Sequence, residues 1–123
     1  MSPRIDTLLE RARHSLERVS PQDLADEVAD GAVLVDIRPA ADRASEGELP
    51  GAIVIERNVL EWRLDPTSEH RLAIASDDAR IIVVCNEGYA SSLAAHTLQQ
   101  LGVTGATDLD GGYRGWRHYR PRA

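Results

Sequence analysis

Three short runs of residues are apolar at every position, and they constrain the fold more than any other feature of the sequence. The runs are 32–35 (Ala-Val-Leu-Val), 52–55 (Ala-Ile-Val-Ile) and 81–84 (Ile-Ile-Val-Val). Successive side chains of a strand point to opposite faces, so a strand without alternation has to be covered on both faces. Strands of a parallel sheet between two layers of helices meet this condition. The runs therefore predict an α/β fold with a mostly parallel central sheet.

The segments that separate these runs have the composition of helices. Helices are predicted over 39–46, 58–64 and 90–101, and a weaker strand over 106–109. Trp62 and Trp116 are expected to anchor the core, because large aromatic side chains bury the most apolar surface.

The N-terminal part of the chain predicts two further helices. Apolar residues from Ile5 to Val19 fall on one face of a helix, and a second helix is expected to begin near Ser20 and end at Gly31. A length of 123 residues suits one domain. We predict an N-terminal helical extension over 1–18 and a single domain over 19–123. The extension either packs on the domain or mediates dimerisation, and the sequence leaves the oligomeric state open.

Composition and charge exclude several classes of function. Twenty acidic residues against 14 basic ones give a formal charge of −6, which disfavours a nucleic-acid partner. No apolar run is long enough for a membrane span or a signal peptide. The single cysteine, Cys85, excludes an internal disulfide and predicts a reducing compartment, the cytoplasm. The four histidines share no metal-ligand spacing, so neither a metal nor a cofactor is predicted. All basic residues are arginines, which indicates a GC-rich, bacterial genome.

The end of the third apolar run carries the clearest chemistry. Cys85 follows this strand, and a short loop leads from it into a helix. Ligands of α/β sheets collect beyond the carboxyl ends of the strands. A loop that curls around the sulfur would point its N–H groups at that atom and favour a thiolate, and Gly88 would permit the turn. The alternative is that Cys85 is a small core hydrophobe.

Four motifs in order resemble the rhodanese-like (sulfurtransferase) family. They are an Asp-x-Arg strand end over 34–38, Gly-Glu-Leu-Pro-Gly-Ala at 47–52, the loop 85–91 and Gly-Gly-x-x-x-Trp at 111–116. The second motif has Glu48 where the family usually has histidine. The resemblance extends over about 19–119, and it implies a five-stranded parallel sheet flanked by helices.

The resemblance also implies sulfane sulfur transfer. The Cys85 thiolate would take one sulfur from a small donor as a persulfide and pass it to a thiol, a cyanide-like nucleophile or a protein, without a cofactor. Asp36 and Arg38 are possible supporting residues, with a structural role favoured for Asp36 and the role of Arg38 left open. The loop that would bind the substrate and the persulfide consists of Asn86, Glu87, Gly88, Tyr89, Ala90 and Ser91.

Departures from the family pattern narrow the range of sulfur donors that we expect. Many relatives that use thiosulfate have basic residues where this chain has Asn86 and Ala90. Glu87 adds a negative charge instead, which predicts that a persulfide is a better donor than thiosulfate. Ser91 stands where phosphatases with a Cys-x5-Arg signature have arginine, so phosphatase activity is disfavoured.

Further alternatives remain open on the sequence alone. The chain is either an enzyme or a catalytically weak or inactive module of the same fold that binds proteins. Ser91 and Ser92 either donate hydrogen bonds to the persulfide or cap the following helix. The basic tail is either solvated or docks an acidic partner; it comprises Arg114, Arg117, Arg120 and Arg122.

Overall fold

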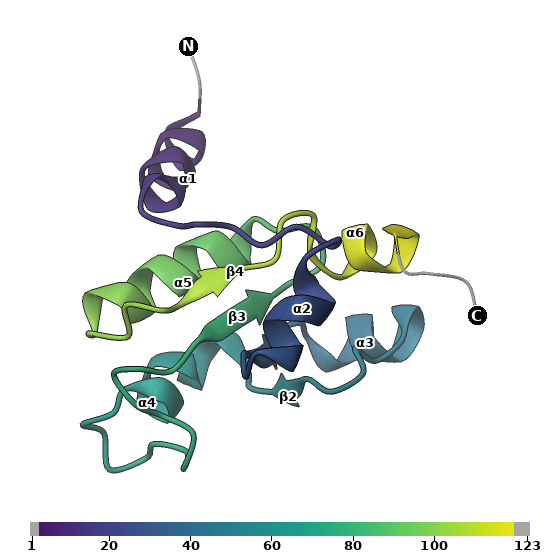
Figure 1. The fold of residues 1–123 in the computed structure, drawn as a ribbon. Helices are drawn as coiled ribbons and strands as arrows, with labels where there is room; N and C mark the ends of the chain where they lie inside the picture. Colours follow the sequence, from purple (N-terminus) through teal and green to yellow (C-terminus); the bar gives the residue numbers. More distant parts are fainter. Residues whose placement is uncertain (1–2, 120–123) are drawn as a thin grey trace.

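A computed structural model describes residues 3–119 as a parallel sheet with helices on both faces (Figure 1). The strands lie in the order β2-β1-β3-β4, with the bounds β1 Val33–Asp36, β2 Ile53–Val54, β3 Ile81–Val84 and β4 Thr107–Asp108. The helices are α1 Arg4–His14, α2 Leu24–Ala29, α3 Ala40–Glu46, a 3₁₀ turn η1 Arg57–Val59, α4 Leu60–Leu64, α5 Ala90–Gln100 and α6 Gly112–Tyr119. The predicted α/β class is confirmed.

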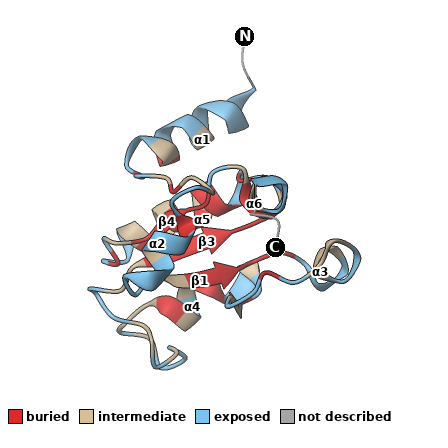
Figure 2. Ribbon diagram, turned by 45° about the vertical axis from the view of Figure 1, so that its right-hand side comes forward, coloured by how far each residue is buried: buried red, intermediate tan, exposed pale blue. Residues whose placement is uncertain are grey.

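Every strand pair in the sheet is parallel. Val35 of β1 lies opposite Val83 of β3 on one side and Ile53 of β2 on the other. The apolar runs separate into two cores, as strands covered on both faces require. Val35 and Val83 belong to a core under α4 and α5, whereas Leu34 and Val84 belong to a core under α2 and α6. Figure 2 shows this buried sheet between its helical layers.

The prediction of five strands is wrong for the part of the chain that the structure describes, because the sheet there has four. Where a fifth strand would lie, Val19 forms a single parallel bridge with Leu109 at the β4 edge. The strand cannot continue past this point, because Pro21 lacks an N–H donor and begins the helical turns that precede α2.

Several predicted elements differ from the observed ones at their ends. The second helix begins at Leu24, after a turn over 21–23, and the predicted strand over 106–109 shortens to the two residues of β4. The helix predicted over 58–64 begins as η1. The expectation for Trp62 is wrong, since its side chain on α4 is 57% exposed. Trp116 is partly buried against Tyr113.

The N-terminal half of helix α1 projects from the rest of the fold, and its C-terminal end lies against α5 (Figures 1 and 2). Only Ala12 of α1 is buried, whereas Ile5 and Leu8 are 55% and 53% exposed. The end of α1 and the connector after it contact α5, for example through Ser15 and His96, whose Oγ and Nδ1 are 3.1 Å apart. The predicted N-terminal helix is therefore present, and its C-terminal end packs on the domain. Among residues 3–119 no helix is long and apolar enough to cross a membrane.

Candidate active site

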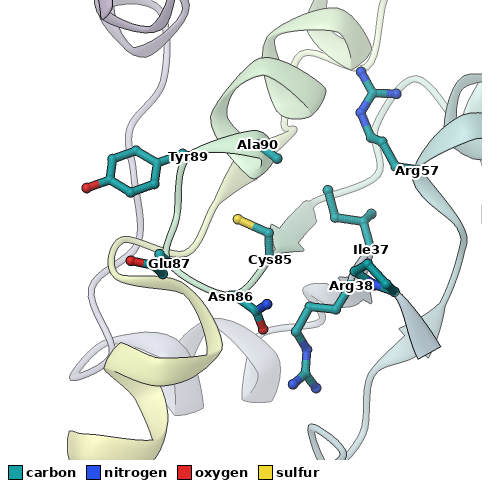
Figure 3. Close-up of a pocket in the computed structure, with 9 residues that line it drawn as sticks. Ile37, Arg38, Arg57, Cys85, Asn86, Glu87, Tyr89 and Ala90 are labelled. Carbon is teal, nitrogen blue, oxygen red and sulfur yellow. The ribbon is translucent and has the colours of Figure 1, made fainter. Parts of the chain in front are cut away.

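Cys85 lies directly after β3, at the carboxyl end of the sheet, and faces a cavity of about 380 Å³. Figure 3 shows the loop from Asn86 to Ala90 curving around the sulfur, with Ile37 on the opposite side. Ile37 directly follows β1, which pairs with β3. The residues at the ends of these two adjacent strands therefore form opposite sides of the cavity. Cys85 is 8% exposed, and its thiol is the only one in the chain.

Two backbone N–H groups of the loop donate to the sulfur. The nitrogen of Gly88 lies 3.2 Å from Sγ of Cys85, and the nitrogen of Ser91 lies 3.4 Å from it. Ser91 is in the first turn of α5, whose leading N–H groups have no partner within the helix. Gly88 has a φ of +89°, a conformation that residues with a side chain rarely adopt. The curled loop expected from the sequence is therefore present.

The start of α6 holds the first part of this loop. The Tyr113 N–H donates to the Cys85 carbonyl over 2.8 Å, and the Arg114 N–H donates to the Asn86 carbonyl over 3.0 Å. A β-carbon on Gly112 would lie 2.5 Å from the Cys85 oxygen, and Gly112 has a φ of +62°. The Gly-Gly-x-x-x-Trp motif thus allows α6 to approach the loop and fix two of its carbonyls on the side of α6.

Two arginines upstream of the domain hold the middle of the loop. The carbonyl of Gly88 accepts hydrogen bonds from Nη2 of Arg13 over 2.7 Å and from Nη2 of Arg18 over 2.9 Å. Arg13 also donates from Nε to Oγ of Ser92 over 3.0 Å. Sequence reasoning missed both arginines, because no local pattern in a helix or connector indicates a contact with a loop about 70 residues away.

The buried carboxylate of Asp108 organises the first turn of α5. Its Oδ2 accepts from the hydroxyls of Ser91 and Ser92 at 2.7 and 2.8 Å, and Arg18 donates to both its oxygens. Among the described residues neither hydroxyl donates to the sulfur: Oγ of Ser91 donates to Asp108, and Oγ of Ser92 donates to Asp108 or, over 3.3 Å, to the Gly88 carbonyl. Neither serine caps α5 through its side chain. Within the loop, Ser91 thus reaches Cys85 through its main chain.

Arg18 remains protonated and positively charged at this position. Burial disfavours its charge, but the hydrogen bond to Asp108 and the negative charges around it outweigh burial, so the pKa of Arg18 lies above its ordinary value.

Asp36 and Arg38 form a buried ion pair beside the cavity. Oδ2 of Asp36 accepts from Nη2 of Arg38 over 2.8 Å, and Oδ1 accepts from the Arg38 backbone N–H over 2.9 Å. The guanidinium lies 3.9 Å from the centre of the Tyr113 ring and bonds the Gly47 carbonyl, so it links three of the family motifs. In Figure 3 it points away from the sulfur. A supporting role for the pair in the reaction remains a prediction.

Glu87 lines the cavity beside Cys85, and its carboxylate has a partner that the sequence did not indicate. Its side chain is 57% exposed and pairs with Arg114, whose Nη1 lies 3.0 Å from Oε1 of Glu87. Arg114 also bonds Glu46 of α3, and Arg117 bonds the Glu46 carbonyl. This part of the basic tail is therefore engaged within the domain, while Arg120 and Arg122 lie outside the described residues.

The remaining loop side chains line the cavity. Asn86 donates from Nδ2 to Asp42 over 3.0 Å, and Tyr89, which is exposed, lies with its ring centre 5.5 Å from the Arg13 guanidinium. Ala90 contributes a small apolar surface. On the opposite wall stands Arg57, which pairs with Glu61 and which the sequence did not single out (Figure 3). Among residues 3–119 no group of three or more histidine, cysteine, aspartate or glutamate side chains is placed to hold a metal.

Comparison with known proteins places this geometry in a family. The profile described as "Rhodanese-like domain" matches residues 20–119. The chain is similar to the thiosulfate sulfurtransferase GlpE of Ectopseudomonas mendocina, at 35% identity over 102 residues that cover 82% of this chain and 84% of the relative.

The chain is also similar in fold to solved structures. The human single-domain sulfurtransferase TSTD1 has a TM-score of 0.71 and 28% identity, covering 85% of this chain and 97% of its own. A protein of unknown function from Rhodopseudomonas palustris, described as a possible tyrosine phosphatase, has a TM-score of 0.84 and 30% identity, covering 96% of this chain and 92% of its own. The chain belongs to the rhodanese-like domain family.

Proposed function

We propose that this chain is a sulfurtransferase that carries one sulfane sulfur as a persulfide on Cys85. The observation that supports this most directly is the pair of N–H groups, from Gly88 and Ser91, that donate to Sγ in an open cavity. Fixed donors of this kind stabilise negative charge on a thiolate or a persulfide. A cysteine that only fills core space does not require donors on its sulfur.

The reaction has two balanced steps. The Cys85 thiolate attacks the outer sulfur of the donor, and the donor's sulfur–sulfur bond breaks with its electron pair leaving on sulfite or on a thiolate. An acceptor thiolate or cyanide then attacks the outer sulfur of the Cys85 persulfide, and the electron pair returns to Cys85. Because the chain has no second cysteine, the acceptor has to come from outside it.

An organic persulfide is the donor we favour over thiosulfate. The loop has no cationic side chain of its own, and its Glu87 carboxylate is paired with Arg114. Two arginines line the cavity, but Arg38 is paired with Asp36 and Arg57 with Glu61. Thiosulfate brings two negative charges into this site, whereas a persulfide group brings one. We place the reaction in the cytoplasm, where thiol acceptors are abundant and a lone cysteine stays reduced.

Intact-mass measurement tests the proposal. After incubation with a low-molecular-weight persulfide or with thiosulfate, we expect the protein to gain the mass of one sulfur atom and to lose it on addition of a thiol or cyanide. Cys85→Ser should gain none. If reduced, folded wild-type protein gains no sulfur from either donor, the chain is a binding module of this fold instead.

Phosphate-ester hydrolysis serves as a negative control. The residue sixth after Cys85 is Ser91, whose hydroxyl is bonded to Asp108, so no guanidinium from the loop grips a phosphoryl group. We expect no hydrolysis of an aryl phosphate above the rate of Cys85→Ser.

A further inference from the structure

Arg13 and Arg18 hold the peptide group between Gly88 and Tyr89, which lies in the chain between the two N–H donors to the sulfur. The Gly88 N–H faces Sγ of Cys85, and the Gly88 carbonyl, on the next peptide, faces Arg13 and Arg18. In a planar trans peptide the C=O and N–H point in opposite directions. Holding the Gly88 oxygen on the arginine side therefore turns the Tyr89 N–H away from the arginines.

Arg13 ties together the two parts of the loop that contact the sulfur. One end of its guanidinium bonds the Gly88 carbonyl and the other bonds Oγ of Ser92, so it spans the segment that contains both donors to Sγ. A guanidinium suits this task because its N–H groups are fixed in one plane. Arg13 thereby acts on the loop through hydrogen bonds to Gly88 and Ser92.

Arg13 differs from Arg18 in that its guanidinium bonds the loop without a carboxylate partner among residues 3–119. Arg18 is neutralised by Asp108 and Asp110. Its guanidinium is partly buried between the loop and the ring of Tyr89. Positive charge that the loop's own sequence lacks is therefore supplied by α1, which lies upstream of the matched domain.

We propose that Arg13 is a positioning residue for sulfur transfer: from helix α1 it locks residues 88–92 around Cys85 and supplies the loop with its positive charge. This inference rests on the proposed function. The N-terminal extension is then a working part of the active site rather than an appendage, and the smallest active unit begins before residue 13.

Arg13→Gln in the full-length chain tests the role of this side chain, with Arg11→Gln as the matched control. Arg11 is an exposed residue of the same helix, so its replacement removes the same charge and leaves the loop untouched. With a saturating persulfide donor, we expect Arg13→Gln to lower kcat about tenfold, which corresponds to the loss of one of its two charge-assisted hydrogen bonds, and to leave KM for the donor unchanged. Arg13→Lys should recover part of the loss, because it keeps the charge and one hydrogen bond.

A second readout separates this proposal from the proposed function. The rate of Cys85 alkylation by iodoacetamide at neutral pH needs no sulfur donor, and we expect it to fall severalfold in Arg13→Gln and to be unchanged in Arg11→Gln. Equal kcat values and equal alkylation rates in Arg13→Gln and wild type would overturn the positioning role. If wild type gains no sulfur but the alkylation rate still falls in Arg13→Gln, the proposed function fails and the positioning role stands.

Discussion

The loop around Cys85 is held on two sides by different means. On one side, main-chain N–H groups at the start of α6 bond the carbonyls of Cys85 and Asn86. On the other, the side chains of Arg13 and Arg18 bond the carbonyl of Gly88. The first support comes from a motif inside the matched domain, and the second comes from residues before it.

The two supports differ in what each of them tolerates. The α6 contact is so close that a single β-carbon on Gly112 would overlap the Cys85 carbonyl. The arginine contact is made by long side chains, which another side chain can replace in part. We therefore expect the α6 support to decide whether the loop forms, and the arginine support to modulate the activity of the formed loop.

Gly112→Ala should break the α6 support and have the largest effect. A β-carbon 2.5 Å from the Cys85 oxygen, at a φ of +62°, should cost about 3 kcal/mol or more of unfolding free energy and abolish sulfur transfer. Chemical denaturation and intact mass measure the two effects. Gly51→Ala shares the positive φ but meets no atom within 4 Å, and Gly115→Ala makes only ordinary contacts. Equal losses in all three variants would contradict the argument from close approach.

Arg18→Met should weaken the arginine support and leave the buried Asp108 carboxylate with only its two serine donors. We expect a loss of about 2 kcal/mol in unfolding free energy, because a buried charge loses its counter-charge. Adding Asp108→Asn to this variant should restore part of the stability. If the loss of unfolding free energy in the double variant exceeds the sum of the losses in the two single variants, unpaired charge is not the cause.

Glu87→Gln should have a smaller effect and sharpen the charge comparison. Arg114 keeps its partner Glu46, so the start of α6 stays in place. We expect the rate of sulfur transfer from thiosulfate to change less than about twofold, as for other exposed ion pairs. Glu48→Gln, at another exposed pair, is the control. A severalfold increase confined to Glu87→Gln would show that the Arg114 pair does not cancel the charge.

The link between α3 and α6 should show a weak dependence on pH. A hydrogen bond from Arg114, opposed by burial, lowers the pKa of Glu46 below its ordinary value of about 4.3. Glu46 therefore contributes stability above that value, and the contribution is lost as pH falls through the lowered pKa. We expect the unfolding midpoints of wild type and Glu46→Gln to differ at pH 7 and to converge below pH 4. A gap of constant size would exclude this ionisation as the cause.

The parts of the fold that follow from local patterns were predictable. Doubly apolar runs such as 81–84 gave a parallel sheet, and the loop after Cys85 was expected to curl around the sulfur, as it does. The five-strand expectation failed because it came from the resemblance, whereas this chain has Pro21 close after Val19.

The electrostatics of the site were not predictable from the loop's sequence. Counting charges between 85 and 91 gives only Glu87, but the fold also brings Arg13, Arg18 and Arg114 to the loop, and Arg57 to the opposite wall of the cavity. The hydroxyls of Ser91 and Ser92 also have a partner, Asp108, that is remote in sequence and buried. Contacts of this kind depend on tertiary packing, which local composition does not encode.

The donors to the Cys85 sulfur are main-chain groups, so binding of the sulfur and selection of the substrate depend on different parts of the site. A substitution in the loop leaves both N–H groups in place unless it introduces proline or a side chain at Gly88, whose φ of +89° disfavours one. Discrimination among sulfur compounds then falls to the walls of the cavity, where Ile37, Arg57 and Tyr89 stand. We therefore expect substitutions in these walls to change the preferred sulfur compound and to leave the chemistry at the sulfur unchanged.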